Sequence, residues 1–393
     1  MSARDALVAL GASLLAAGLL ARLGRRIGLP TIPLFMLAGL LFGPNTPGIQ
    51  LVDHPDDFAL LATLGLILLL FYLGLEFSLG ELTAGGRSLA TAGAVYLALN
   101  IGAGLAFGFA LGWGTREALV IAGAVGISSS AIVTKILVEM HRLTNRETRL
   151  VLGIVVIEDL FLAVYLAVLQ PVLDESSSTV DALLSFSKAF GFLIAVALIA
   201  RYGASIVGRL LDAEQDELLT VCFVGFAVLV AGIAEELHVS DAIGAFMAGL
   251  VIAETSAAPR VRKLVLPLRD TFAALFFFTF GLTVDPGDVA SVAGPIAIAI
   301  VVTIVVNFTA ALVVARREHL DQRATTNLAT TILARGEFSL IIATLGAEAG
   351  LDARIVPFVA GYVLVLALGA PILAAQSARV ARCVPRRLVR EVR

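Results

Sequence analysis

The stretch VLGIVVIEDLFL, residues 151–162, places two adjacent carboxylates in the middle of an apolar run. These residues, Glu158 and Asp159, are costly to bury, because an ionised group loses its hydration and a second negative charge lies beside it. An apolar segment that carries such a pair indicates a functional site. What the pair binds depends on the solvent around this segment and on the segments that pack beside it.

The composition indicates that this solvent is lipid. Of the 393 residues, 59% are hydrophobic and only 15% are charged, and the mean hydropathy is +0.96. A soluble domain carries about 25% charged residues. The net charge of −3 gives no indication of a nucleic-acid partner. Cys222 and Cys383 lie far apart, so they predict neither a disulfide framework nor a metal site.

The apolar runs are numerous enough for a polytopic membrane protein. A spanning helix needs about 20 mostly apolar residues. Runs bounded by charges, Pro and Gly predict an all-α protein with about 13 transmembrane helices. We expect them near residues 5–22, 30–48, 57–79, 87–113, 117–140, 147–172, 181–210, 216–237, 240–256, 268–284, 290–316, 323–348 and 354–382.

Basic residues predict the orientation of these helices. The loops after odd-numbered spans and the tail after the last span are rich in Arg, whereas the loops after even-numbered spans offer only Arg116 and Arg354 and are otherwise acidic. Cytoplasmic loops carry the excess of Lys and Arg. We therefore expect a multi-pass protein of the cell (inner) membrane, with the N-terminus outside and the C-terminus in the cytoplasm.

The two halves of the sequence resemble each other. FMLAGLLFG at 35–43 matches FMAGLVIAE at 246–254, and LLLFYLGLEFS at 68–78 matches LFFFTFGLTVD at 275–285, at offsets of 207–211 residues. Six helices per repeat and one linker helix place the second copy seven spans after the first. Because seven is odd, the second copy would enter the membrane upside down, as in many secondary transporters. The sequence predicts a first inverted repeat of six helices at 1–172, a linker helix at 173–212, a second repeat at 213–383, and a basic cytoplasmic tail at 384–393.

Polar interruptions occur at equivalent places in the two repeats. The same offset maps GISSSAIVT at 126–134 onto RGEFSLIIA at 335–343. Ser128, Ser129 and Ser130 make a poor helix interior, because their hydroxyl groups compete for backbone partners. Paired interrupted segments indicate the binding site of a transporter. The alternative is that these small residues only allow close helix packing.

Three further polar residues lie at membrane depth. Arg335 and Glu337 are charged, so they must face protein or water and find partners. They could form part of the site or an internal ion pair that serves structure only. Asn307 is the single amide of TIVVNFTAA. It could be a contact between helices or a site residue.

The acid pair suggests the chemistry. Neighbouring residues of a helix point about 100° apart, so only one of Glu158 and Asp159 can face the interrupted segments directly. A carboxylate in a low-dielectric cavity can release its proton near physiological pH. The ionised form is then a hard-oxygen ligand for a cation. Competition between a proton and a cation for one group is the minimal chemistry of an exchanger.

Five segments of the chain resemble a known family. RLGRRIGLPTIPLFMLAGLLFGP, LLLFYLGLEFSL, GISSSAIVTKILVE, VVIEDLFLAV and ARGEFSLII occur in the same order as in monovalent cation:proton antiporters, most similarly to bacterial potassium efflux systems. The resemblance implies a Na⁺/H⁺ antiporter-like fold with crossed broken helices at 126–134 and 334–338. It also implies a homodimer, with a dimerisation domain packed on a mobile core domain that works by elevator-type alternating access. By the family pattern Asp159 binds the monovalent cation, K⁺ or Na⁺.

The chain departs from this family pattern in two places. Glu158 stands where the family usually has Asp, Asn or Gln, and Asn307 stands near the place of a lysine that pairs with this first acid in electrogenic members. A protonated Glu158 would mimic the Gln of the potassium branch, so we expect electroneutral exchange. Many relatives also carry a cytoplasmic nucleotide-binding regulatory domain after the last helix. This chain stops at Arg393 with a basic tail and no G-x-G-x-x-G unit there, so we expect either a naturally short form or one truncated before such a domain, and a cytoplasmic regulatory domain or subunit is a candidate partner.

The sequence therefore predicts a secondary active transporter that exchanges K⁺ or Na⁺ for H⁺ and needs no cofactor. The ion- and proton-binding candidates are Asp159, Glu158, Ser128, Ser129 and Ser130, supported by Arg335, Glu337 and Asn307. A channel or pore-forming subunit of an ion-translocating complex is one alternative, and an organic-anion symporter on a related inverted-repeat fold is another. An enzyme is not indicated, because the sequence has no metal spacing, nucleophile triad or phosphate loop.

Overall fold

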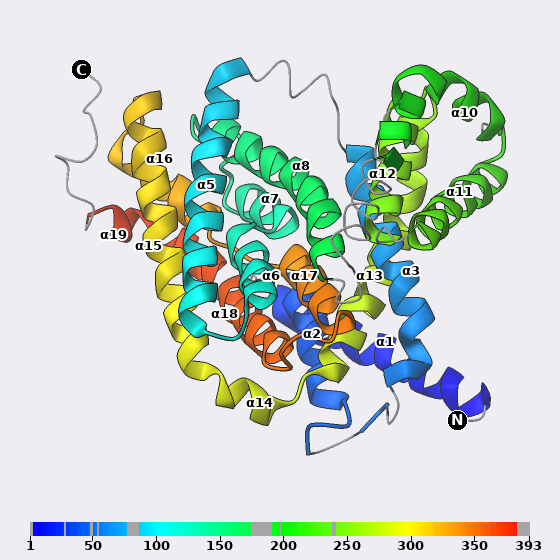
Figure 1. Cartoon of the computed structure of the whole chain (residues 1–393), viewed down its shortest axis with the longest axis horizontal. Helices are drawn as coiled ribbons and strands as arrows, with labels where there is room; N and C mark the ends of the chain where they lie inside the picture. Colours follow the sequence, from blue (N-terminus) through cyan, green and yellow to red (C-terminus); the bar gives the residue numbers. More distant parts are fainter. Residues whose placement is uncertain are drawn as a thin grey trace. The chain divides into compact units, whose positions relative to one another are not determined.

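The part of the chain that the structure, a computed structural model, describes is entirely helical. The described residues are 3–26, 29–47, 50–52, 55–76, 86–173, 191–192, 194–196, 198–211, 213–237 and 241–382. In chain order the helices are α1 (Ala3–Arg25), α2 (Thr31–Phe42), η1 (Pro55–Phe58), α3 (Ala59–Glu76), α5 (Gly86–Leu111), α6 (Thr115–Gly126), α7 (Ser130–Glu139), α8 (Thr148–Leu173), η2 (Ile199–Gly203), α10 (Ala204–Leu211), α11 (Asp216–Glu236), α12 (Asp241–Ala253), α13 (Ala258–Thr283), α14 (Pro286–Ser291), α15 (Ala293–Glu318), α16 (Gln322–Thr331), α17 (Glu337–Glu348), α18 (Ile355–Ala375) and α19 (Ser377–Ala381) (Figure 1). The prediction of an all-α protein is confirmed.

Many of these helices are suited to a bilayer. Within the described residues, eight are long and apolar enough to cross it, namely α1, α3, α5, α8, α11, α13, α15 and α18. Helices α2 and α12 are apolar but shorter. The predicted spans at 117–140 and 323–348 are each divided into two helices. The predicted span at 181–210 lies partly outside the described residues.

One predicted boundary is wrong. Helix α13 begins at Ala258, ten residues before the predicted start at 268, and includes Arg260, Arg262 and Lys263. In the sequence, this run of charged residues is typical of a loop between spans. Arg260 and Arg262 instead find partners from within the helix; Arg262, for example, donates to the carbonyl of Leu75.

The chain divides into two compact units (Figure 1). Unit 1 comprises Met1–Leu14, Asp53–Glu81 and Ala163–Thr279, and unit 2 comprises Leu15–Val52, Leu82–Leu162 and Phe280–Arg393. The boundaries fall inside α1, α8 and α13, so each of these helices contributes residues to both units. Each unit also draws on both halves of the sequence.

Unit 1 is built around a close contact between α3 and α12. A Cβ atom at Gly74 would collide with the carbonyl oxygen of Phe246, and one at Gly249 would collide with that of Phe71. Both positions therefore need glycine for the backbones to approach. The ring of Phe71 also stacks on that of Phe223 in α11, with 5.9 Å between the centroids.

Unit 2 contains the same kind of contact between α2 and α13. A Cβ atom at Gly281 would collide with the carbonyl oxygen of Met36, and it would lie 3.0 Å from the Leu40 nitrogen. Gly281 is the counterpart of Gly74 at the offset of 207 residues, and α2 carries the motif that matches α12. The third helix of each predicted repeat thus packs against the second helix of the other. The two contacts are counterparts of each other, as symmetry between two repeats would give, and the repeat boundaries remain a prediction.

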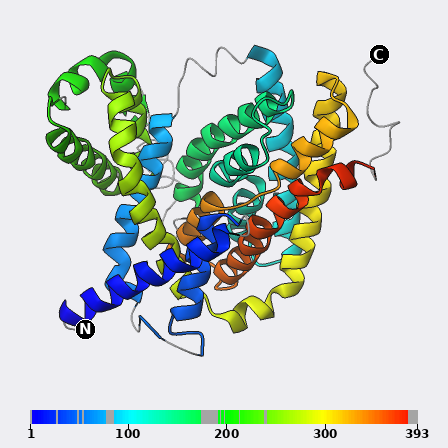
Figure 2. The ribbon, with the colours of Figure 1, turned by 180° about the vertical axis from the view of Figure 1, so that it is seen from behind.

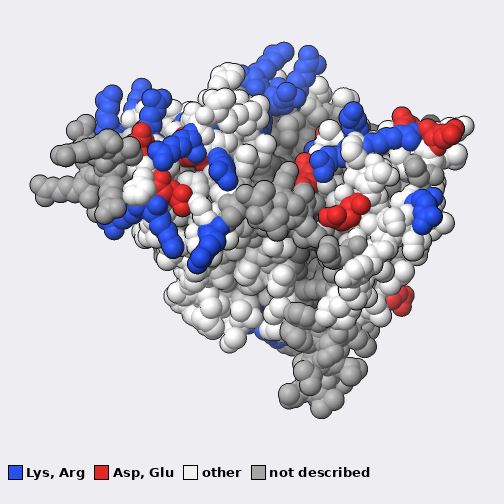
Figure 3. Space-filling model, turned by 90° about the horizontal axis from the view of Figure 1, so that it is seen from above, with Lys and Arg blue, Asp and Glu red and all other residues white. Residues whose placement is uncertain are grey.

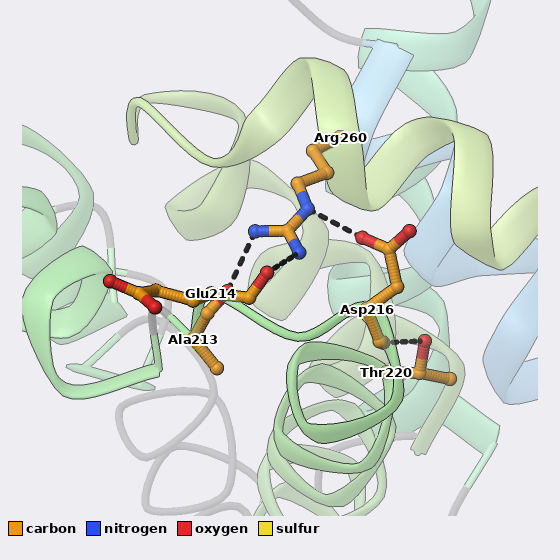
Figure 4. Close-up of polar contacts among 5 residues, drawn as sticks. All are labelled: Ala213, Glu214, Asp216, Thr220 and Arg260. Carbon is orange, nitrogen blue, oxygen red and sulfur yellow. Dashed lines mark hydrogen bonds and ion pairs between the residues drawn. The ribbon is translucent and has the colours of Figure 1, made fainter.

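A polar anchor in unit 1 fixes the segment that leads into α11 (Figure 4). The guanidinium of Arg260 in α13 donates to the carbonyl oxygens of Ala213 and Glu214 and to the carboxylate of Asp216, each at 2.6 Å. The Arg260 and Asp216 side chains are 37% and 65% exposed. Because exposed ion pairs add little stability, this contact mainly sets where α11 begins.

In unit 2, the loop between α7 and α8 is bound to the ends of two other helices. Arg142, in the loop before α8, donates to the carbonyl of Ala374 at 2.7 Å and to the Ser377 hydroxyl at 2.9 Å. Arg146 in the same loop donates to the carbonyl of Glu318 at 3.4 Å. These contacts join the loop after the predicted fifth span to the end of α15 and to the junction of α18 and α19.

Helix α16 is a polar helix in an apolar environment. Its threonines are buried, and the hydroxyl groups of Thr325, Thr326 and Thr330 donate to carbonyls four residues earlier at 2.7–2.9 Å. Asn327 donates to the buried carboxylate of Glu147 at 2.7 Å. Because these donors are satisfied by the protein, the helix can lie away from water.

Two loops assigned to the other side also meet in unit 2. The guanidinium of Arg354 lies 4.7 Å from the centroid of the Trp113 ring. It also donates to both carboxylate oxygens of Asp352, with Nη2 at 2.5 Å from Oδ2. These hydrogen bonds hold the pKa of the Asp352 carboxyl group below its usual value.

The lowered pKa predicts how stability depends on pH. The stability from the Asp352 carboxylate is present above the unfolded-state pKa, about 3.9, and is lost as the pH falls through the lower folded-state value. Asp352→Asn should therefore lower the thermal unfolding temperature at neutral pH, and the difference from wild type should vanish well below about pH 4. Arg354→Gln should behave alike. An equal difference at neutral and acid pH in detergent would contradict this account.

Candidate functional site

Two broken helices cross in unit 2. Helix α6 ends at Gly126 and α7 begins at Ser130, while α16 ends at Thr331 and α17 begins at Glu337. The two interruptions are joined by a backbone hydrogen bond from the Ser129 nitrogen to the Ala334 oxygen, at 3.0 Å. A Cβ atom at Gly336 would come within 2.6 Å of the Ser129 hydroxyl oxygen, so this crossing needs glycine there. The predicted interruption of both helices is confirmed.

The starts of α7 and α17 receive carboxyl groups. Glu158 of α8 accepts hydrogen bonds through Oε2 from the Ser128 nitrogen at 3.3 Å and from the Ser128 hydroxyl group. Glu337 begins α17 and accepts from the Ser129 hydroxyl group at 2.6 Å. The Ser129 oxygen also caps α7, where it accepts from the Ile132 nitrogen at 3.3 Å. Helix N-termini carry partial positive charge, which favours acids at these positions.

The ends of α6 and α16 receive the positive charge of Arg335. Its Nε donates to the carbonyl of Val125 at 2.8 Å, and its Nη1 donates to that of Ile332 at 3.0 Å. Nη1 also lies 3.3 Å from the carbonyl oxygens of Leu333 and Ala334. Helix C-termini carry partial negative charge and unpaired carbonyls. We expected a buried Arg335 to need partners, and the structure shows that these partners include main-chain oxygens.

The acid pair lies beside this crossing. The Glu158 side chain is 1% exposed and that of Asp159 is 6% exposed. The guanidinium charge of Arg335 acts on the Glu158 carboxyl group. Ser128 and Ser129 are buried, and Ser130, as the first residue of α7, is partly exposed. Unit 2 thus brings together the serines, Arg335, Glu337 and Glu158, and places Asp159 next to them in α8.

Asn307 reaches the same region through residues that the sequence reading missed. Helices α5 and α15 lie side by side (Figure 1 and Figure 2), and Asn307 of α15 donates to Asn100 Oδ1 of α5 at 3.1 Å. Asn100 Oδ1 also accepts from Arg335 Nη2 at 3.2 Å. Thr303 and Tyr362 extend the network through a hydroxyl–hydroxyl contact of 2.7 Å. The repeat offset of 207 maps Asn307 onto Asn100, and this signal could have found it.

The site offers oxygen ligands in a dry setting. Within the described residues, no group of three or more His, Cys, Asp or Glu side chains could hold a metal ion. The oxygen atoms at this crossing belong to carboxyl groups, hydroxyl groups and main-chain carbonyls. These hard ligands suit an alkali cation, and protonation of the carboxylate would displace it.

Comparison with known proteins gives the family. The family model described as "Sodium/hydrogen exchanger, transmembrane" matches residues 11–376. The K(+)/H(+) antiporter subunit KhtU of Bacillus subtilis (strain 168) is 39% identical over 378 residues, which are 95% of this chain and 93% of that protein. The ammonium/H(+) antiporter subunit AmhT of Alkalihalophilus pseudofirmus is 27% identical over 82% of each chain.

A solved structure has the same fold. The sodium proton antiporter MjNhaP1 from Methanocaldococcus jannaschii superposes with a TM-score of 0.71 over 97% of this chain and 99% of that one, at 17% sequence identity. Identity this low supports likeness of fold alone. The family match over most of the chain carries the assignment. The chain belongs to the sodium/hydrogen exchanger family of cation:proton antiporters and is a multi-pass membrane protein.

Proposed function

We propose that this protein exchanges a monovalent cation, K⁺ or Na⁺, for protons, and that the two compete for Asp159. The observation that carries the proposal is the buried acid pair beside the crossing of two broken helices. The names of the relatives agree with it, since KhtU is a K⁺/H⁺ and AmhT an ammonium/H⁺ antiporter subunit. The 39% identity to KhtU favours K⁺.

Glu158 keeps its proton through the cycle, so that exchange is electroneutral. Both donors from Ser128 reach Oε2, which leaves Oε1 to carry the proton. Within the described residues Arg335 forms no direct ion pair with Glu158, because its N–H groups point to four carbonyl oxygens and to Asn100. Two adjacent carboxylates in a low dielectric cannot both ionise cheaply. The ionised one is then Asp159.

Transport proceeds by elevator-type alternating access. Unit 2 contains the whole crossing and the acid pair, so it is suited to carry the ion as one body. Unit 1 is the dimerisation domain, and the protein is a homodimer. The exchanged contacts of Gly74 and Gly281 support the inverted repeats on which such a mechanism relies.

The orientation follows the basic loops. Lys and Arg side chains are prominent on the face drawn in Figure 3, and the loop that carries Arg142 and Arg146 belongs to the predicted cytoplasmic set. The protein lies in the cell membrane with a cytoplasmic C-terminus. KhtU and AmhT are both named as subunits. A regulatory subunit on the cytoplasmic side of this protein is accordingly part of the proposal.

The first test removes the charge of Asp159. Asp159→Asn is nearly isosteric and should fold, but its amide cannot bind and release a proton, so cation-driven proton flux should stop. Flux is measured in proteoliposomes with an internal pH dye under gradients of K⁺, Na⁺ or Li⁺. Asp270→Asn is the control, because Asp270 is 62% exposed in unit 1. Flux like that of wild type in Asp159→Asn would refute the assignment, and uncoupled cation flux in wild type would favour a channel.

A second test concerns Glu158 and electroneutrality. Glu158→Gln preserves the shape and hydrogen bonding of a protonated glutamate, so proton flux should persist with negligible steady current on a solid-supported membrane. Glu158→Asp shortens the side chain and should reduce flux more, because it loses its reach to Ser128. A large wild-type current that disappears in Glu158→Gln would show that Glu158 carries charge through the cycle.

A further inference from the structure

Arg335 dictates the orientation of two buried amides. A guanidinium has hydrogen-bond donors and no acceptor. Its Nη2 lies 3.2 Å from Asn100 Oδ1, so Asn100 presents its oxygen to Arg335. The same oxygen accepts from Asn307 Nδ2 at 3.1 Å, and Asn100 Nδ2 donates to the Tyr96 carbonyl at 3.0 Å. The Arg335 guanidinium therefore determines which way the amide groups of Asn100 and Asn307 are turned.

This arrangement of hydrogen bonds leaves the Asn307 side-chain oxygen without a donor. Asn307 Nδ2 also donates to the carbonyl of Thr303 at 2.9 Å, so both of its hydrogens are used. Asn307 is fully buried, and its Oδ1 has no hydrogen-bond partner within the described residues. A buried oxygen without a donor is costly and demands an explanation. The chain accepts this cost because rotating the amide would break both bonds of Nδ2.

The network lies within electrostatic reach of the acid pair. The hydroxyl group of Tyr96 donates to the Asn307 carbonyl at 3.5 Å, and Tyr96 lies within electrostatic range of the Glu158 carboxyl group. The charge of Arg335 acts on Glu158 and on Tyr362. The charged and titratable groups around the amides are thus Arg335, Glu158, Tyr96 and Tyr362, with Asp159 and Glu337 beside them at the crossing.

We propose that Asn100 is a positioning residue of the exchange site, a role that rests on the exchange function proposed above. Its single amide oxygen holds the guanidinium of Arg335 against the ends of α6 and α16. The same oxygen keeps Asn307 turned so that Asn307 Oδ1 remains available as an acceptor. Asn100 thereby sets the electric field at the acid pair without contacting the transported ion.

Two substitutions separate the acceptor from the rest of the side chain. Asn100→Leu keeps the approximate volume and removes the acceptor for both donors. Asn100→Asp keeps an acceptor oxygen and adds a negative charge beside Arg335. Asn327→Leu is the matched control, because it also removes a buried amide of unit 2, one that donates to Glu147. Cation-driven proton flux is measured for each between about pH 6 and about pH 9, with thermal unfolding in detergent.

The expected results differ between the variants. Asn100→Leu should raise the apparent KM for the cation about tenfold, because Arg335 is no longer held by a charge-assisted hydrogen bond. Asn100→Asp should keep KM within about threefold and move the pH profile of exchange upward by about one unit, because the new charge offsets part of that of Arg335. Asn327→Leu should change neither quantity, even if it lowers the unfolding temperature.

If Asn100→Leu and Asn100→Asp change only the unfolding temperature, as Asn327→Leu does, the role is structural and the proposal is overturned. If Asn100→Leu does not fold, Asn100→Asp decides alone through its pH profile. If wild type shows no flux at all, the exchange function fails, and stabilisation by KCl or NaCl relative to choline chloride becomes the readout. Stabilisation lost in Asn100→Leu but kept in Asn327→Leu would then support positioning, whereas equal stabilisation would overturn it.

Discussion

The guanidinium of Arg335 is the contact on which the crossing of the two broken helices depends. Interrupting a helix inside a membrane exposes main-chain carbonyls at one end and N–H groups at the other, and lipid can satisfy neither. Arg335 supplies donors to carbonyls at the ends of both α6 and α16. Carboxyl groups and serines serve the opposite ends, where Glu158 and Glu337 accept from Ser128 and Ser129. The break is tolerated because hydrogen-bond donors serve the carbonyl ends, and carboxyl and hydroxyl oxygens serve the N–H ends.

This arrangement also suits the proposed exchange of a proton for a cation at a buried site. The half-helix termini that stabilise the acids are fixed dipoles, so no large reorganisation is required when a proton leaves and a cation arrives. The protein needs one group whose charge changes, which is the proposed role of Asp159, and a surrounding shell that stays constant. Unit 2 supplies that shell with the buried network of Asn100, Asn307 and Thr303.

The sequence predicted the helical class, both helix interruptions and the acid pair, because each leaves a polar mark in an apolar run. It could not identify the acceptors of Arg335, because every residue has a main-chain carbonyl and the sequence does not single out that of Val125. Asn100 was missed because a single amide in an apolar helix resembles an ordinary helix contact, and its partner lies 207 residues away. The start of α13 was misplaced because the charged residues around Arg260 are typical of a loop. In the structure these residues belong to the helix, and Arg260 binds the segment before α11.

Proton release on cation binding tests the central claim most directly. The purified protein is titrated with KCl or NaCl in weakly buffered detergent solution, and both the heat and the pH change are recorded. Competition for one carboxylate predicts that up to one proton is released per bound cation. The apparent Kd for the cation should rise about tenfold for each unit by which the pH falls below the pKa of that carboxyl group. Cation binding that releases no proton and keeps the same Kd across this range would contradict the account.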